Sequence, residues 1–233
     1  MNINGKELKI IGHRGAAALE PENTLLSFQK AIDSGCEMIE TDARLSLDGK
    51  IVLMHDKKID RTTNGKGLVE DKYLHELKKM DAGKKETIPT LEELWDIIKN
   101  KTELNIEIKE KEVLDNILLF IDKEGAKNNI LLSSRHYRLL EKIKKSNPSL
   151  RTGFVAYSPI LAMWRALKMK AESIHPVFFI ANSKMVQKAH QNNINVYPFP
   201  YGTEPEDPKS IKKLINMGID GIFLNDPTVL KNI

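Results

Sequence analysis

The chain has 233 residues, 41% of them hydrophobic and 29% charged, which is enough to bury the core of one large domain or two small ones. Its 36 basic residues exceed its 32 acidic residues only slightly, and they are scattered through mixed-charge stretches, so nucleic acid is not an expected partner. The N-terminal segment has no signal-like apolar stretch and no run approaches the ~18 apolar residues of a membrane span, so a cytoplasmic protein without stable membrane insertion is expected.

Short apolar, β-branched runs alternate along the chain with longer segments of helical periodicity. The expected strands are residues 8–12, 38–42, 104–109, 130–133, 151–155, 171–175, 194–198 and 221–225. The expected helices are residues 24–34, 91–99, 113–124, 137–145, 161–169, 183–191 and 208–216. This alternation indicates parallel strands joined by crossover helices, and eight such units predict a closed (β/α)8 TIM barrel. An open doubly wound sheet is the alternative that the pattern leaves open.

One segment, about residues 44–89, interrupts this alternation with a short strand, a polar glycine-containing loop and one expected helix at residues 73–79. A segment this short with few large apolar groups could hardly fold alone, so we expect an insertion after the second barrel strand within a single domain, 1–233. Asp48-Gly49 is a favoured hairpin turn pair. If these two are the central turn residues, the register places His55 opposite Asp42.

Three acidic residues lie at the ends of expected barrel strands. Glu40 and Asp42 are two positions apart, so on a strand they share a face, and Glu107 shares a face with Lys109 on the next strand. Carboxylates on one buried face repel each other unless a cation lies between them. The sequence therefore predicts a site for one divalent cation, Mg²⁺ or Ca²⁺ with Mn²⁺ also compatible. The alternatives are an outward-facing register for the pair and an exposed edge strand for Glu107.

Two histidines end apolar runs beside these acids. His13 follows the first expected strand, and His55 follows the short strand of the insertion. Strand ends face the catalytic mouth of a barrel, so histidines there suggest acid–base chemistry on an oxygen-rich substrate. Arg14 offers a planar fork suited to phosphate, between Gly12 and Gly15, which let the backbone approach a ligand. The alternatives are a structural histidine at position 13 and a surface ion pair for the arginine.

At these residues the chain resembles the glycerophosphodiester phosphodiesterase family. The matching stretches, in order, are Gly12-His13-Arg14-Gly15, Pro21-Glu22-Asn23-Thr24, Glu40-Thr41-Asp42, Asp48-Gly49, His55-Asp56, Asp60-Arg61-Thr62-Thr63-Asn64-Gly65-Lys66-Gly67, Ile88-Pro89-Thr90-Leu91-Glu92-Glu93 and Glu107-Ile108-Lys109. The second half matches more loosely, through Gly218-Ile219-Asp220-Gly221 and Asn225-Asp226-Pro227.

The resemblance implies a (β/α)8 barrel with a small insertion. It implies an enzyme of lipid and glycerol metabolism that hydrolyses a small glycerophosphodiester to sn-glycerol 3-phosphate and an alcohol. It also implies roles for individual residues: His13 and His55 as general acid and base, Arg14 and Lys109 as phosphate-neutralising groups, and Glu40, Asp42 and Glu107 as ligands of the divalent ion. Direct attack by water and attack by the substrate's own glycerol hydroxyl both fit this set.

One stretch departs from the family pattern, because Val196-Tyr197-Pro198-Phe199-Pro200-Tyr201 stands where members usually carry a Trp-Thr-Val-Asn-like stretch. Phe199, Tyr201 and residues 159–164 could form an apolar mouth suited to lipid-like leaving groups, or could be plain loop packing. The substrate is thus open between soluble deacylated phospholipids and an amphiphile, which a lysophospholipase D-type or phosphoinositide-cleaving relative would cleave with the same residues. A silent barrel that only binds phosphorylated ligands is disfavoured, because both histidines and all three acids are present.

Overall fold

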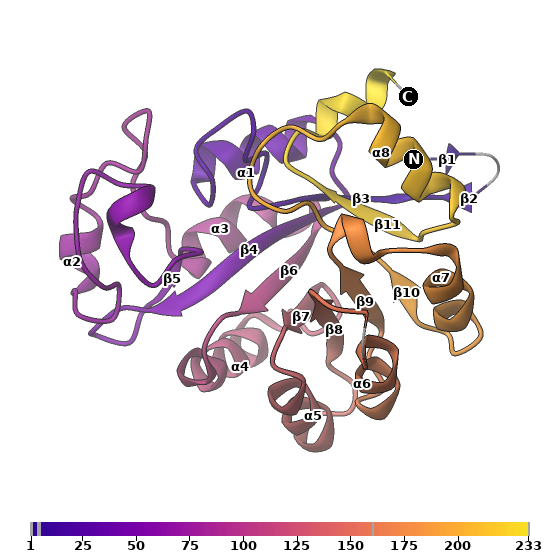
Figure 1. The fold of residues 1–233 in the computed structure, drawn as a ribbon. Coiled ribbons are helices and arrows are strands. Elements are labelled where there is room, and N and C mark those ends of the chain that lie inside the picture. Colours follow the sequence, from indigo (N-terminus) through magenta and orange to yellow (C-terminus); the bar gives the residue numbers. More distant parts are fainter. Residues whose placement is uncertain (1, 4–5, 160, 233) are drawn as a thin grey trace.

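A computed structural model describes residues 2–3, 6–159 and 161–232. Its centre is a parallel sheet curled into a barrel (Figure 1). The barrel strands are β3 (Lys9–Gly12), β4 (Met38–Leu45), β6 (Glu103–Ile108), β7 (Ile130–Ser134), β8 (Arg151–Ala156), β9 (Ser173–Pro176), β10 (Asn195–Val196) and β11 (Gly221–Leu224). A separate antiparallel pair, β1 (Asn2–Ile3) and β2 (Lys6–Glu7), precedes them.

The strands follow the order β10-β9-β8-β7-β6-β4-β3-β11. The two end strands are joined by backbone hydrogen bonds from Asp220 N–H to the Val196 carbonyl (3.1 Å) and from Phe223 N–H to the Pro198 carbonyl (2.9 Å). These bonds nearly close the ring, so the predicted (β/α)8 barrel is confirmed and the open sheet is wrong.

Helices cover the outside of the barrel (Figure 1). They are α1 (Leu25–Asp33), α3 (Leu91–Ile98), α4 (Leu114–Glu124), α5 (Tyr137–Ser146), α6 (Ala162–Lys168), α7 (Ser183–His190) and α8 (Pro208–Asn216), with short 3-10 turns η2 (Lys111–Val113), η3 (Phe178–Ile180) and η4 (Pro227–Asn232). Several starts follow from the sequence: the Thr24 hydroxyl accepts from Ser27 N–H, and Thr90 and Glu93 form a reciprocal capping box. The main apolar core fills the layer between strands and helices, as for a sheet buried on both faces.

The segment after β4 folds back as β5 (Ile51–Leu53), η1 (Ile59–Arg61) and α2 (Leu74–Leu77). Its side chains form a small apolar cluster of their own: Val52, Met54, Ile59, Val69, Leu77 and Ile88. This cluster supports the short connection that carries His55 from β5 to the mouth of the barrel.

The predicted hairpin register is wrong by one residue. Ala43 faces Leu53, and Met54 N–H donates to the Asp42 carbonyl at 2.9 Å, so Met54 rather than His55 lies opposite Asp42. The reason is the turn, which has three loop residues and places Gly49 in the left-handed region at φ +73°. A three-residue hairpin loop places its last residue in the left-handed region, which favours glycine, so the Asp-Gly pair occupies the last two positions of a longer turn than expected.

Candidate active site

The loop after β3 is shaped by its glycines and by close packing on α1. Gly15 has φ +81°, and a Cβ there would lie 2.3 Å from Ser27 Oγ and 2.6 Å from the Ser27 carbonyl carbon, so only glycine fits. The turn puts Arg14 at φ +51° and lets its backbone N–H donate to Glu40 Oε2 at 2.7 Å. The first histidine loop is therefore bonded directly to the carboxylate strand.

His13 is buried against aromatic rings and held by an amide. Its Nδ1 lies 2.7 Å from Asn225 Oδ1, while Asn225 Nδ2 donates to the carbonyls of Gly202 (3.2 Å) and Glu204 (2.8 Å). Because the NH2 side of the amide already donates, its oxygen accepts from His13 Nδ1–H, which leaves Nε2 of the neutral ring with a free lone pair. Burial, assisted by the charge of Arg14, lowers the pKa of His13 to about 3.

His55 is held by a carboxylate at the end of a chain of ion pairs. Its Nδ1 lies 2.6 Å from Asp56 Oδ1, and Asp56 Oδ2 accepts from Arg61 Nε at 2.6 Å. Arg61 also binds both oxygens of Glu22 at 2.8 Å, and Glu22 accepts from Arg14 at 3.0 Å. Burial lowers the pKa of the His55 ring. The chain connects the two histidine loops through alternating charges.

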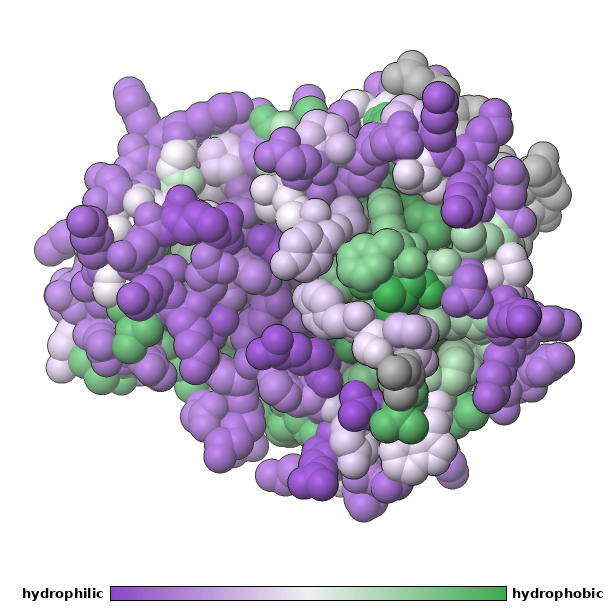
Figure 2. Space-filling model, in the orientation of Figure 1, coloured by the Kyte–Doolittle hydropathy of each residue, from purple (hydrophilic) through white to green (hydrophobic). Residues whose placement is uncertain are grey.

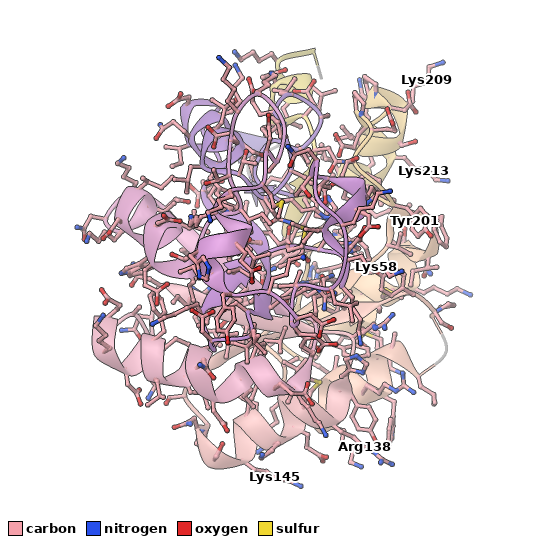
Figure 3. The ribbon with its side chains drawn as sticks, turned by 90° about the vertical axis from the view of Figure 1, so that its left-hand side faces the viewer. Lys58, Arg138, Lys145, Tyr201, Lys209 and Lys213 are labelled. Atoms are coloured by element: carbon pink, nitrogen blue, oxygen red, sulfur yellow. The ribbon has the colours of Figure 1, made fainter. Side chains whose placement is uncertain are left out.

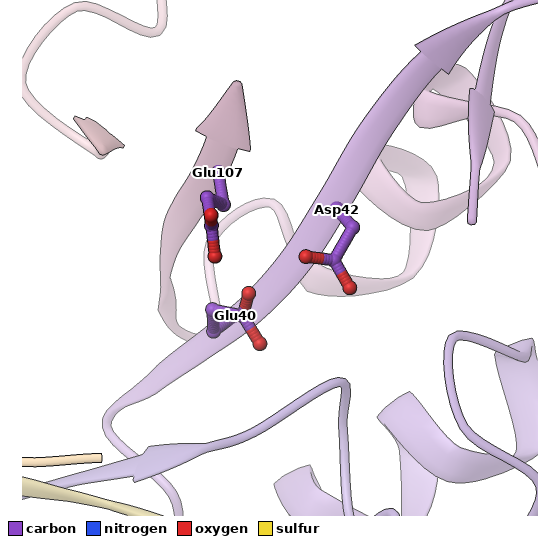
Figure 4. A group of neighbouring side chains, drawn as sticks. All are labelled: Glu40, Asp42 and Glu107. Carbon is purple, nitrogen blue, oxygen red and sulfur yellow. The ribbon is translucent and has the colours of Figure 1, made fainter. Parts of the chain in front are cut away.

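The three predicted carboxylates meet in the mouth of the barrel. Figure 4 shows Glu40 and Asp42 on β4 and Glu107 on β6, and each has an oxygen within 4.8 Å of the others. Lys109 Nζ lies 2.9 Å from Asp42 Oδ1 and 2.9 Å from Glu107 Oε1. The structure therefore brings together the three acids and the lysine.

The electrostatics of this cluster fit a cation site. Burial and the charges of Asp42 and Glu107 raise the pKa of Glu40 well above its usual range. Burial also acts to raise the pKa of Asp42, but the charges of Lys109 and Arg14 outweigh it and hold that pKa well below its usual range. Three hard oxygen donors in mutual repulsion are a set that a divalent ion could bind and relieve, with the identity of the ion open.

Two asparagines in the site were not predicted as functional residues. Asn23, at φ +56°, donates from Nδ2 to Asp42 Oδ2 at 2.9 Å and accepts from the Thr41 hydroxyl at 2.8 Å. Asn225 orients His13. Both asparagines lie in stretches that match the family, residues 21–24 and 225–227, and this match is the sequence signal that could have identified them. In the structure both side chains are buried and hydrogen-bonded to site residues, which indicates their role.

Two cavities flank the second histidine. One, of about 670 Å³, is lined by Arg14, His55, Asp56, Arg61, Arg135, Tyr157, Phe199, Pro200, Tyr201, Gly202 and Thr203. The other, of about 620 Å³, is lined by Arg44, His55, Asp56, Lys57, Lys58, Leu68, Glu107, Ile108, Lys109, Arg135 and Tyr157. They share a wall of four residues, His55, Asp56, Arg135 and Tyr157, so they form two lobes of one cleft.

The predicted aromatic mouth is present in part. Phe199 and Tyr201 line the first lobe. In the segment 159–164, Ile160 lies outside the described residues, and the others line neither lobe. Trp164 instead packs edge-on against Tyr137, with ring centroids 6.4 Å apart, on the outer surface.

None of the helices in the described parts of the chain is both long enough and apolar enough to span a membrane. A (β/α)8 barrel that gathers two histidines, three carboxylates and two cationic side chains at its mouth is the arrangement of a hydrolytic barrel enzyme acting on an anionic substrate.

Comparison with known proteins identifies the class further. Residues 13–229 match the glycerophosphoryl diester phosphodiesterase family. A glycerophosphodiester phosphodiesterase of Caldanaerobacter subterraneus subsp. tengcongensis is 35% identical over 96% of this chain and 96% of its own. Among solved structures, a Thermotoga maritima glycerophosphodiester phosphodiesterase superposes with a TM-score of 0.83 at 28% identity, covering 97% of this chain and 98% of that one.

An Oleispira antarctica phosphodiesterase, solved in complex with the product sn-glycerol-3-phosphate, superposes with a TM-score of 0.88 at 29% identity, covering 96% of this chain and 95% of that one. The chain therefore belongs to the glycerophosphoryl diester phosphodiesterase family. The predicted family, fold and enzyme class are confirmed.

Proposed function

We propose that this enzyme hydrolyses soluble glycerophosphodiesters to sn-glycerol 3-phosphate and an alcohol, and so serves lipid and glycerol metabolism. The proposal is supported most by one observation, that both histidines lie beside the carboxylate cluster: His13 lines a small cavity with Glu40 and Glu107, and His55 lines a lobe of the cleft with Glu107. The Oleispira relative with sn-glycerol-3-phosphate bound is consistent with that product. The chain 1–233 then acts as one barrel domain, with residues 44–89 as its insertion.

The two histidines serve as the acid–base pair. Each ring is anchored through Nδ1, His13 by Asn225 and His55 by Asp56, which leaves Nε2 of each for the substrate. Hydrolysis forms one phosphorus–oxygen bond and breaks the bond to the alcohol. One histidine takes the proton of the attacking hydroxyl group, and the other gives a proton to the leaving alcohol oxygen.

The charged side chains stabilise the phosphoryl group. A phosphodiester carries one negative charge and gains more as the nucleophile adds, so Arg14 and Lys109 bind it more strongly in the transition state. Glu40, Asp42 and Glu107 would hold a divalent ion, Mg²⁺, Ca²⁺ or Mn²⁺. When bound, such an ion supplies further positive charge to the phosphoryl oxygens.

The test is the release of sn-glycerol 3-phosphate from glycerophosphocholine and glycerophosphoethanolamine, in EDTA and then with each divalent ion restored. We expect release that depends on the ion and that falls by orders of magnitude in His13→Ala and His55→Ala. His75→Ala is the matched control, because His75 is an exposed histidine that lines neither lobe of the cleft. Near-normal turnover in both site variants, or full activity after the metal is removed, would contradict the proposal.

A further inference from the structure

The second lobe of the cleft carries more positive charge than one phosphodiester requires. Five cations line it, Arg44, Lys57, Lys58, Lys109 and Arg135, against two carboxylates, Asp56 and Glu107. Figure 2 shows the surface over the insertion as mostly hydrophilic, with an apolar patch lying further along, over the region of η3. This side of the mouth is thus built for charged groups.

Some of these cations are already neutralised within the protein. Arg44 pairs with Glu110 at 3.0 Å and donates to the His55 carbonyl, and Lys109 pairs with the carboxylate cluster. Arg61, in the neighbouring lobe, forms ion pairs with two carboxylates, Glu22 and Asp56. Because these cations are already paired within the protein, they would bind a second anionic group of a substrate only weakly.

The remaining three are Arg135, Lys57 and Lys58. Within the described parts of the chain, none of them forms an ion pair with a carboxylate, and the Arg135 guanidinium makes a polar contact with the neighbouring His136 ring at 3.5 Å. Figure 3 shows Lys58, from the insertion, and Tyr201, from the segment after β10, on the same side of the molecule; Lys58 lines the second lobe and Tyr201 the first.

Arg135 is also held in a defined place. It follows β7 directly, and the next residue, His136, donates its backbone N–H to Ser134 Oγ at 3.2 Å. The Ser134 hydroxyl in turn donates to the Ile108 carbonyl at 2.9 Å, at the end of the strand that bears Glu107. The backbone that presents the guanidinium is therefore fixed relative to the carboxylate cluster, and Arg135 lines both lobes.

We propose that this enzyme prefers glycerophosphodiesters whose alcohol carries a second phosphate, which Arg135 binds with the help of Lys57 and Lys58. This inference rests on the proposed function. A guanidinium fork matches two phosphate oxygens, and lysines add point charges around it. The glycerol half of the substrate bears only neutral hydroxyls, so a second anionic group belongs to the alcohol, and the lobe with the unpaired cations is the one that receives the alcohol.

The experiment compares glycerophosphoinositol with glycerophosphoinositol 4-phosphate, which differ by one phosphate and each release one sn-glycerol 3-phosphate. We expect kcat/KM to be about tenfold higher for the phosphorylated substrate, and the preference to shrink as salt rises from low to high ionic strength. Arg135→Gln should remove about fivefold of that preference while changing kcat/KM for glycerophosphoinositol less than twofold. Lys57→Gln combined with Lys58→Gln should remove most of the remainder.

Arg138→Gln is the matched control, because Arg138 is an exposed arginine three residues along that lines neither lobe. It loses the same charge and should keep the preference. Equal kcat/KM for the two substrates in the native enzyme, or an equal loss on both in Arg135→Gln, would overturn the inference and leave the hydrolase function standing. Failure to cleave either substrate or glycerophosphocholine would instead refute the proposed function, and this inference with it.

Discussion

Replacing Gly15 by alanine tests whether the packing of the first histidine loop determines the site. The position has φ +81°, and the added methyl group would overlap the backbone of Ser27, which cannot move aside as a flexible side chain could. Gly35 is a matched control, with φ +85° and no atom within 4 Å of the Cβ that alanine would add. Both changes impose the same backbone strain, and only Gly15→Ala adds the overlap.

The expected magnitudes follow from these two contributions. An L-residue in the left-handed region costs ~1–2 kcal/mol, so Gly35→Ala should lower the free energy of unfolding by about that amount. Overpacking a tight contact costs a further ~1–3 kcal/mol, so Gly15→Ala should lose ~2–5 kcal/mol in all. The overlap also pushes the Arg14 amide away from Glu40, so kcat/KM should fall in Gly15→Ala and stay near normal in Gly35→Ala.

Urea denaturation monitored by far-ultraviolet circular dichroism gives the two free energies of unfolding, and steady-state kinetics on glycerophosphocholine gives the activities at a temperature where both variants are folded. If the two variants lose the same free energy within ~0.5 kcal/mol, and both keep native kcat/KM, then close packing of this loop on α1 does not set the site.

Three further changes test other contacts. Asn225→Ala should lower kcat about 10–100-fold with little change in KM, because the His13 ring loses the contact that fixes its tautomer. Steady-state kinetics measure both constants. Lys109→Met should lose ~3–5 kcal/mol of unfolding free energy in EDTA, because the buried carboxylates lose their cation, and Mg²⁺ or Ca²⁺ should restore part of it in thermal unfolding. Burial lowers the pKa of His175 to about 3, below its value near 6.5 in the unfolded chain. The contribution of the neutral ring to the free energy of unfolding is therefore complete above pH 6.5. It falls by up to ~1.4 kcal/mol per pH unit as the pH drops toward 3. His175→Gln should flatten that part of the unfolding profile measured by urea denaturation.

Each of these has a contrary result. A loss in Asn225→Ala confined to KM would point to substrate binding rather than proton transfer. Equal destabilisation of Lys109→Met with and without divalent ions would mean that the carboxylates do not bind them. An acid profile identical in His175→Gln and the native enzyme would assign the acid sensitivity to other groups.

Much of the barrel could be predicted from the sequence because its signals are local. Thr24 and Thr90 cap their helices, and the alternation of apolar runs with helical segments sets the strand order. The strand expected at 194–198 is formed only at Asn195–Val196, although Tyr197 N–H still donates to the Ile174 carbonyl at 2.9 Å and Phe199 N–H to the Pro176 carbonyl at 3.0 Å. The hairpin register failed because Asp-Gly serves two turn lengths, and nothing local distinguishes them.

The site was predictable where its residues end strands and unpredictable where distant segments meet. Glu40, Asp42 and Glu107 come from neighbouring strands, so their convergence follows from the topology. The contact between Glu22 and Arg61 depends on how the insertion folds back on the barrel, which no local pattern states. His175 lies one residue before the end of β9 but is only 1% exposed, with its ring next to Tyr197 and Phe223 and its Nε2 2.8 Å from the Ser173 hydroxyl. It therefore lies in the barrel interior, below the open mouth.

The salt-bridge chain from Arg14 through Glu22, Arg61 and Asp56 to His55 connects the insertion to the barrel part of the proposed active site. One imidazole, His13, follows a barrel strand and the other, His55, lies in the insertion, and the ion pairs connect the two loops. An insertion taken from a homologue would therefore need an arginine and an aspartate in place of Arg61 and Asp56, positioned to pair with Glu22 of the barrel. Without that pairing, we expect the chimaera to fold but His55 to be misplaced relative to His13.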